Sequence, residues 1–340
     1  MNVPGKERAD AKMAMHACDR VLVTAPGFDV DGESTGVRLR RAGLTLNHAG
    51  PRGGRLPAEV AELVEGAVAV IASADPFTAD VFAAAPGLRV IARSGVGVDS
   101  IDLDAATRAG VVVTTTPGLN DETCADHTLA LLLAALRRIV EHDASMRRGE
   151  WDRGGELTPW DLHGKRVGVI GYGRIGRAVV RRLEGFGTQI RVFDPVAAPD
   201  GDRACGSLEE LLAWADVVTL HAPLTADTLK MIGAAELATM RPGAVLVNAS
   251  RGGLIDEPAL VQALTSGHLR AAALDVFVEE PPRHAGLRYL PNLVLSPHIG
   301  GLSREAIDAM TRQCVQQVLD VLDGRVPDGA VNPGVLQRTR

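Results

Sequence analysis

The sequence of 340 residues is poor in aromatic side chains, with three Trp, two Tyr and six Phe making up 3% of the chain. Its core must therefore be built mainly from Ala, Val, Leu and Ile, which a chain of this length can do. The four cysteines lie far apart and form no C-x-x-C pair, so neither a disulfide framework nor a zinc site is expected. We expect no bound metal and a reducing, cytoplasmic environment.

Long apolar runs and runs of basic residues are also missing. The longest apolar stretches, such as residues 129–136, fall far short of the roughly 18 residues that a membrane span needs. Acidic residues number 42 and basic residues 36, a net charge of −6 that does not indicate a nucleic-acid surface. Residues 1–19 have mixed charge and no apolar core, which predicts a disordered tail rather than a signal peptide.

What is present is an ordinary globular composition in which short apolar runs alternate with amphipathic stretches. In the first half, the expected strands cover residues 21–24, 67–71, 88–92 and 111–114. Helical spacing follows over residues 57–65, 78–85, 103–109 and, in one longer helix, 122–148. In the second half, the expected strands cover residues 166–170, 189–193, 217–220, 244–247, 271–274 and 293–295. Repeated strand–helix–strand units predict an α/β fold with two doubly wound parallel-sheet lobes.

A glycine-rich turn follows the first strand of the second lobe. Gly171, Gly173 and Gly176 match G-x-G-x-x-G and lie between that strand and a helix expected over residues 177–186. In such a motif the first glycine permits a tight turn, the second lets a pyrophosphate approach the backbone, and the third allows close helix–strand packing. The helix N-terminus then offers unpaired N–H groups to the phosphates. Alone the motif is weak, because glycines mark many strand–helix turns.

Asp194 strengthens this interpretation because it ends the next strand, 18 residues after Gly176. A carboxylate about 20 residues beyond the glycines typically binds the adenosine ribose. It also repels a 2′-phosphate, and Pro195 follows with no Arg or Lys to offset that repulsion. The sequence therefore favours NAD over NADP as the cofactor. The alternative is that Asp194 only terminates a strand.

Three further polar side chains, Arg251, Glu280 and His298, each follow a later strand of the second lobe. Open α/β sheets place ligand chemistry at this carboxyl edge. Histidine has the side chain best suited to proton transfer near neutral pH, and a neighbouring carboxylate fixes its tautomer. Arginine provides a permanent charge and a planar fork for a carboxylate. Each residue singly has a bland explanation, such as a turn cap or a surface ion pair, but jointly they indicate an active site.

Taken in order, the segments G-Y-G-R-I-G, N-A-S-R-G-G, D-V-F-x-x-E-P and S-P-H-I-G-G resemble the D-isomer-specific 2-hydroxyacid dehydrogenases. The phosphoglycerate dehydrogenase-like branch is the most similar, over residues 21–323. The resemblance implies that Arg251 binds substrate, His298 is the general acid/base and Glu280 is its partner. It also implies that a Rossmann NAD-binding domain, residues 120–304 with the long helix, is inserted in a flavodoxin-like substrate domain formed by residues 20–119 and 305–340.

The resemblance assigns ligand contacts as well. Val96 and Gly97, in the loop of residues 94–99, would present backbone N–H groups to the substrate carboxylate, although an ordinary turn explains this loop equally well. Asp275 would hold the nicotinamide carboxamide. The full set of implied cofactor contacts is Gly171, Gly173, Arg174, Ile175, Gly176, Asp194, His221, Ala222, Pro223, Ala249, Ser250, Arg251, Asp275, His298, Gly300 and Gly301. One departure is Cys124-Ala125-Asp126, where the family usually has V-A-E.

The favoured interpretation is an NAD-dependent oxidoreductase that interconverts a small D-2-hydroxy acid and its 2-keto acid. By resemblance we expect a homodimer. One alternative is an NAD(H)-sensing binding protein, such as a corepressor, on the same fold. Another is a dehydrogenase for phosphite or formate, of which formate is disfavoured because its enzymes typically have Gln at the position of Glu280.

Overall fold

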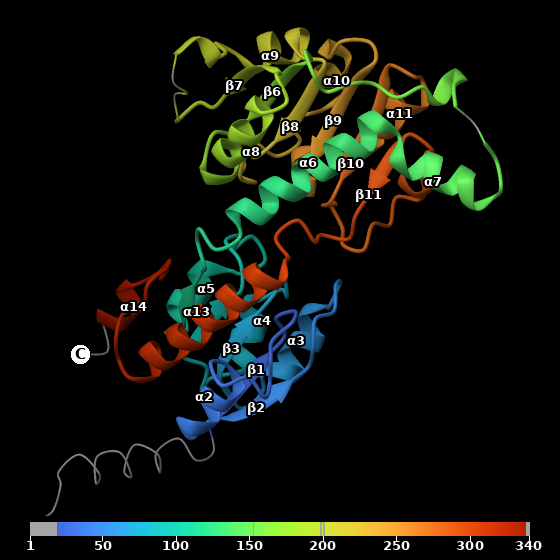
Figure 1. The fold of residues 1–340 in the computed structure, drawn as a ribbon. Coiled ribbons are helices and arrows are strands. Elements are labelled where there is room, and N and C mark those ends of the chain that lie inside the picture. Colours follow the sequence, from blue (N-terminus) through green and yellow to red (C-terminus); the bar gives the residue numbers. More distant parts are fainter. Residues whose placement is uncertain (1–18, 152, 198, 200, 338–340) are drawn as a thin grey trace, which may run out of the picture. The chain divides into compact units, whose positions relative to one another are not determined.

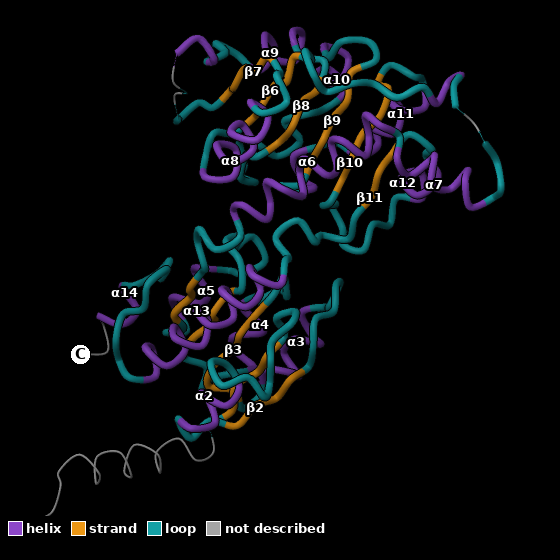
Figure 2. The backbone as a smooth tube through the Cα atoms, viewed as in Figure 1, coloured by secondary structure: helices purple, strands orange, loops and turns teal. Residues whose placement is uncertain are grey.

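The computed structural model describes residues 19–337 apart from residues 152, 198 and 200, so the predicted tail lies outside it except for its last residue. The described residues form two compact units, one comprising residues 19–120 and 303–337, the other Asp121–Leu302. The expected boundaries differ from these by one or two residues. Each unit has one parallel sheet with helices on both faces (Figures 1 and 2), which confirms the expected fold class.

The first unit contains a five-stranded parallel sheet of order β2-β1-β3-β4-β5, the doubly wound order of flavodoxin-like folds. Its strands are β1 (Arg20–Val23), β2 (Thr45–His48), β3 (Ala67–Ala72), β4 (Val90–Arg93) and β5 (Val112–Thr114). One face packs against α3 (Pro57–Val64), α4 (Ala79–Ala84) and α5 (Leu103–Arg108). The other face packs against α2 (Gly36–Arg41) and α13 (Arg304–Leu322). Buried Val, Leu, Ile and Ala side chains supply most of both interfaces.

Neither β2 nor α2 of this unit was among the expected elements. The sequence of β2, T-L-N-H, contains one large apolar residue, and its side chains are exposed or half-buried at the edge of the sheet. The helix α2 has six residues, three of them arginine. Neither segment carries a clear apolar period, because an edge strand and a short surface helix bury little of their surface.

The last long helix, α13, packs against β3 and β4 and is joined to the edge strand β5 by a buried amide. The Gln317 side chain accepts a hydrogen bond from Thr114 Oγ1 and donates to the carbonyls of Thr115 and Asp328, each at 2.7 Å. The following segment runs antiparallel beside β5, with a bridge between Thr114 and Ala330. It ends in the short helix α14 (Gly334–Gln337).

The second unit contains a six-stranded parallel sheet of order β11-β10-β9-β8-β6-β7. Its strands are β6 (Arg166–Ile170), β7 (Gln189–Phe193), β8 (Val217–Leu220), β9 (Ala244–Asn248), β10 (Leu269–Leu274) and β11 (Leu293–Leu295), at or within two residues of the expected ranges. A parallel bridge between Val192 and Ala204 adds one further pairing beyond β7. The strand order reverses between β6 and β8, and open α/β sheets bind their ligands at such a switch point.

Helices cover both faces of this sheet. One face packs against α6 (Asp121–Arg137) and α8 (Arg174–Glu184). The other packs against α9 (Leu208–Trp214), α10 (Ala234–Thr239), α11 (Glu257–Thr265) and α12 (Ala285–Tyr289). Single 3₁₀ turns lie at η1 (Gly155–Leu157), η2 (Gly201–Arg203) and η3 (Gly252–Leu254). Among the described residues, no helix is both long and apolar enough to cross a membrane.

The long helix expected over residues 122–148 is wrong in one respect, because it breaks at Arg138 into α6 and α7 (Ile139–Arg147). Arg138 adopts the left-handed conformation, with φ of 53°. No glycine or proline marks this break. Instead, the largely buried Arg138 guanidinium pairs with Glu141, at 3.0 Å between Nη2 and Oε1.

Replacing Gln317 by Ala tests the attachment of α13. The substitution removes three buried hydrogen bonds and leaves two carbonyls unpaired, so we expect a loss of about 2–4 kcal/mol in the free energy of unfolding, measured by urea denaturation. Gln313→Ala, on the same helix at a half-buried position, is the matched control and should change stability much less. Equal effects of the two substitutions would contradict this role of Gln317.

Candidate active site

The glycine turn joins β6 to α8 at the switch point of the second sheet. Gly171 has φ of 92°, and a Cβ on it would lie 2.6 Å from the backbone of His221, while a Cβ on Gly176 would lie 2.2 Å from the Gly171 oxygen. Gly173 precedes α8 without a side-chain cap, and a Cβ there would meet no atom within 4 Å. The backbone thus has space beside Gly173, at the N-terminus of α8, and is closely packed at Gly171 and Gly176, which fits a pyrophosphate.

Asp194, at the end of β7, is fixed by backbone donors. Its carboxylate accepts hydrogen bonds from the N–H groups of Tyr172 at 2.6 Å and of Val196 and Ala197 at 2.8 Å. Partial burial raises the pKa of Asp194, but these bonds and the nearby Arg177 outweigh that effect and lower it. No Arg or Lys directly follows Asp194, as expected, and the nearby Arg177 comes instead from α8.

The loop after β8 lies against the glycine turn. Burial lowers the pKa of His221 to about 4, so its imidazole is neutral at pH 7, and its Nε2 lies 3.0 Å from Thr219 Oγ1. Ser250 Oγ donates to the Ala222 carbonyl at 2.7 Å and so connects this loop to the one after β9. Pro223 is exposed beside them.

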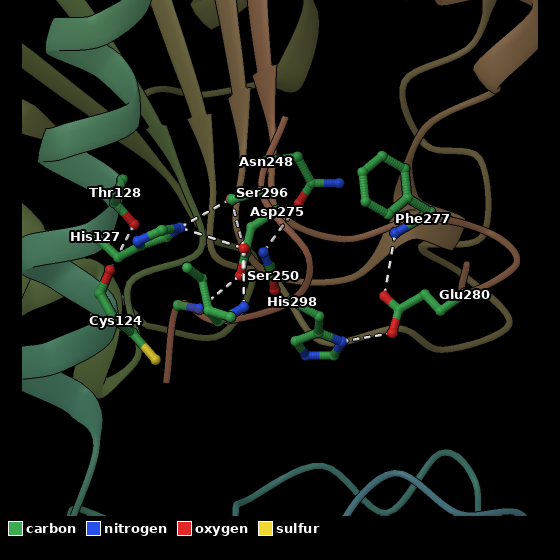
Figure 3. Close-up of polar contacts among 12 residues, drawn as sticks. Cys124, His127, Thr128, Asn248, Ser250, Asp275, Phe277, Glu280, Ser296 and His298 are labelled. Atoms are coloured by element: carbon green, nitrogen blue, oxygen red, sulfur yellow. Dashed lines mark hydrogen bonds and ion pairs between the residues drawn. The ribbon is translucent and has the colours of Figure 1, made fainter. Parts of the chain in front are cut away.

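Asp275, directly after β10, lies at the centre of a network of hydrogen bonds (Figure 3). It is almost fully buried, with 1% of its surface exposed. Its carboxylate accepts from Ser296 Oγ at 2.6 Å, from the Ile299 N–H at 3.0 Å and from the Gly300 N–H at 2.7 Å. His127 Nε2, from α6, lies 3.2 Å from the same carboxylate and 3.0 Å from Ser296 Oγ. Since the Ser296 proton goes to Asp275, His127 Nε2 must itself carry a proton.

These donors keep Asp275 ionised. Burial alone raises the pKa of its carboxyl group, but the bonds from His127, Ser296 and the two backbone N–H groups prevail and lower it to about 2. A buried charge that is fully hydrogen-bonded is costly to disturb. Residues on both sides of His298, namely Ser296, Ile299 and Gly300, are therefore hydrogen-bonded to the Asp275 carboxylate.

His298, which lies between Ser296 and Ile299 in the sequence, has an unusual backbone conformation. Its φ is 53°, in the left-handed region that non-glycine residues seldom adopt, and its N–H donates to the Asp275 carbonyl at 2.8 Å. Its Nδ1 lies 2.7 Å from Glu280 Oε2, and the other carboxylate oxygen of Glu280 accepts from the Phe277 N–H at 3.2 Å. A carboxylate can only accept, so Nδ1 is the donor, and Nε2 is left for another partner.

Arg251 follows β9 in a turn that a buried amide shapes. Asn248 Nδ2 donates to the Arg251 carbonyl at 2.8 Å, and Asn248 Oδ1 accepts from the Ser250 N–H at 3.0 Å. The next residue, Gly252, packs so tightly that a Cβ would lie 1.9 Å from the backbone of Phe277. The turn that carries Arg251 thus lies directly against the loop that carries Glu280.

Cys124, on α6, is a buried thiol that is affected by the charges of Asp275 and Arg251. Burial, with the charges of Asp121 and Asp275, raises the pKa of this thiol to about 12, and Arg251 opposes the increase. The thiol is therefore neutral at physiological pH. Asp126, which stands where the family usually has Glu, forms an ion pair with Arg182 of α8 at 2.6 Å.

The predicted substrate loop belongs to the first unit and follows β4. Gly95 has φ of 143° and leaves room for the Arg93 side chain, which donates to the carbonyls of Ser94 at 2.6 Å and Gly97 at 3.2 Å. The N–H groups of Val96 and Gly97 form no hydrogen bond within the described part of the chain. This loop therefore offers two adjacent backbone donors.

The sequence motifs indicate no role for His127, Ser296 or Asn248. Ser296 and Asn248 lie inside the motifs S-P-H-I-G-G and N-A-S-R-G-G, so their positions could have indicated that they belong to the site. His127 comes from a distant helix, and no local pattern indicates that it reaches Asp275. No group of three or more His, Cys, Asp or Glu side chains that could hold a metal occurs among the described residues.

The switch-point glycine turn, the Asp194 carboxylate at the end of the next strand and the imidazole–carboxylate pair are together typical of a dinucleotide-binding α/β protein. Residues 129–300 match the family model described as "D-isomer specific 2-hydroxyacid dehydrogenase, NAD binding domain". The chain belongs to the D-isomer-specific 2-hydroxyacid dehydrogenase family, which confirms the resemblance drawn from its motifs.

Several relatives are similar over most of this chain. D-3-phosphoglycerate dehydrogenase of Mycobacterium tuberculosis is 42% identical over 81% of this chain and 53% of its own length. Glyoxylate reductase of Korarchaeum cryptofilum is 42% identical over 77% of this chain and 82% of its own. The solved structure of TT0316 protein from Thermus thermophilus has a TM-score of 0.83 at 44% identity, covering 92% of this chain and 99% of that one. The chain thus spans about half the length of the phosphoglycerate dehydrogenases it matches.

Replacing Asp275 by Asn tests the network. In Asn, an NH2 group replaces one of the carboxylate oxygens and faces N–H donors. The lowering of the Asp275 pKa from 3.8 to about 2 corresponds to roughly 2–3 kcal/mol of stabilisation of the folded state. We expect that loss in the free energy of unfolding near pH 7. Since the folded-state pKa of Asp275 is the lower one, its contribution is present above about pH 4 and is lost as pH falls towards about 2.

The difference in stability between the wild type and Asp275→Asn should therefore narrow below about pH 4, as followed by urea denaturation at several pH values. Asp161→Asn, at an exposed position, is the control and should leave stability unchanged. A difference between wild type and Asp275→Asn that stayed constant from about pH 6 to pH 2 would contradict the account.

Proposed function

We propose that the protein is an NAD-dependent oxidoreductase that interconverts a small D-2-hydroxy acid and its 2-keto acid. The observation that carries this proposal is the 2.7 Å contact between His298 Nδ1 and Glu280 Oε2, at a strand end of the sheet that carries the glycine turn. Family membership and the names of the relatives, phosphoglycerate dehydrogenase and glyoxylate reductase, support the same reaction class.

His298 is the general acid/base in this proposal. Glu280 holds Nδ1 and orients the ring, so that Nε2 accepts the substrate hydroxyl proton in oxidation and returns it in reduction. A carboxylate beside the ring also stabilises the imidazolium that forms when the proton is taken up. The left-handed backbone at His298, held by Asp275, gives the imidazole a single orientation.

Arg251 binds the substrate carboxylate and stabilises charge on the reacting oxygen. Its guanidinium is permanently charged and planar, and the buried Asn248 fixes the backbone that carries it. The free N–H groups of Val96 and Gly97 are proposed as further donors to the substrate carboxylate.

The residues of the second unit fit NAD, which when bound supplies or accepts a hydride at its nicotinamide ring. The pyrophosphate is proposed to bind at the N-terminus of α8, in the turn formed by Gly171, Gly173 and Gly176. The Asp194 carboxylate accepts a hydrogen bond from the N–H of Tyr172 in the same turn. The remaining cofactor contacts, from Arg174 to Gly301, are proposed because the family resemblance implies them.

The substrate is proposed to be a short 2-keto or 2-hydroxy acid, with glyoxylate and 3-phosphoglycerate as the first compounds to assay. A cytoplasmic location is also proposed, because the described cysteines, Cys124, Cys205 and Cys314, are free thiols.

Replacing His298 by Ala is expected to lower kcat for NADH-dependent reduction of 2-keto acids by at least about 100-fold, the usual scale of general acid–base catalysis. Since His298 is one of many proposed cofactor contacts, the Kd for NADH, followed by its fluorescence, should rise far less than kcat falls, which separates lost chemistry from lost folding. His163→Ala removes an exposed histidine and serves as the control. Near-normal turnover by His298→Ala would refute the assignment.

A homodimer formed through α7 is proposed as the assembly. Ile139, Val140, Met146 and Trp151 are between 51% and 75% exposed along this helix and just after it. Such a group of large apolar side chains is typical of a protein interface.

Light scattering should therefore give about twice the chain mass of 35.8 kDa. Val140→Glu places a charge in the interface and should yield the monomer. Val326→Glu, at an equally exposed apolar position elsewhere, should stay dimeric. A monomeric wild type at micromolar concentration would exclude this assembly.

A further inference from the structure

The backbone of Tyr172, in the glycine turn, forms hydrogen bonds with two side chains of opposite charge. Its N–H donates to Asp194 Oδ2 at 2.6 Å, and its carbonyl accepts from Arg177 Nε at 3.0 Å. The Arg177 guanidinium carbon also lies 5.1 Å from the centre of the Tyr172 ring. The carboxylate and the guanidinium are thus both anchored at the turn that fits the cofactor phosphates.

Arg177 differs from the other arginines of α8. Arg174 pairs with Asp121, Arg181 with Glu122, and Arg182 with Glu122 and Asp126, all acids of α6. Arg177 is exposed and forms no ion pair within the described part of the chain, and its two terminal nitrogens donate no hydrogen bond there. Up to four N–H donors of this side chain are therefore available to an external anion.

The chemistry of the two groups is opposed towards a phosphate. A 2′-phosphate on the adenosine ribose is repelled by the Asp194 carboxylate, whereas a guanidinium binds phosphate oxygens through parallel N–H bonds. Asp194 is itself held by three backbone N–H groups, so it cannot turn away from an incoming phosphate without losing them. The balance between NADH and NADPH is then set by whether a cation stands beside that carboxylate.

We propose that Arg177 is a specificity-determining residue for the cofactor: it receives the 2′-phosphate of NADPH and gives the protein measurable affinity for NADPH despite Asp194. This inference rests on the proposed function, since it assumes that the glycine turn binds a nicotinamide dinucleotide. Asp194 sets the preference for NADH, and Arg177 limits how strong that preference becomes.

The test is a fluorescence titration of the purified full chain with NADH and with NADPH at low ionic strength. We expect Arg177→Gln to raise the Kd for NADPH about five- to tenfold and the Kd for NADH less than about twofold, since only NADPH carries the added charge. Arg177→Lys should retain part of the NADPH affinity. Arg181→Gln removes the same charge from the same helix, at the face that meets α6, and should leave the ratio of the two Kd values unchanged.

Salt dependence is a second readout. Raising the salt concentration should weaken NADPH binding more than NADH binding in the wild type, and this difference should shrink in Arg177→Gln. An unchanged ratio of Kd values in Arg177→Gln, or a wild type that binds NADH but no NADPH, overturns the inference alone. A wild type that binds neither dinucleotide overturns the proposed function as well.

Discussion

The candidate active site depends on the buried carboxylate of Asp275. It joins its own segment, after β10, to two others that are distant in the sequence: α6, through His127, and the segment after β11, through Ser296 and the backbone just beyond His298. A buried charge without these donors costs several kcal/mol, so each donor is held in place by the penalty of leaving the carboxylate unpaired. The unusual backbone conformation of His298 is maintained by this arrangement.

Two carboxylates near His298 have different environments and different roles. Asp275 is buried, and both its oxygens accept bonds from within the chain, so it acts as part of the scaffold. Glu280 is partly exposed, with one oxygen on the Phe277 N–H and the other on the imidazole of His298. In the proposed mechanism, Glu280 stabilises a proton taken up by that imidazole, while Asp275 keeps the ring in position. This proposed division of roles keeps the loop rigid during proton transfer.

Much of this structure could be predicted from local patterns. Each strand of the second sheet coincides with a short, mainly apolar run, and Gly171 and Gly176 are required by close contacts that only glycine permits. The strand Thr45–His48 was missed because an edge strand buries little. The break at Arg138 has no local marker, and Arg177 and His127 act across space on residues far along the chain. Such contacts depend on tertiary packing, which a single sequence does not display.

The central claim is that Glu280 and Asp275 aim the His298 imidazole at the reacting carbon of the substrate. The most direct test is a crystal structure of the protein with NADH and an unreactive 2-keto acid analogue. We predict that His298 Nε2 lies about 3 Å from the analogue's keto oxygen, that Arg251 contacts its carboxylate, and that the internal donors of Asp275 are unchanged. An analogue bound with His298 Nε2 directed away from it, or without contact to Arg251, would contradict the account.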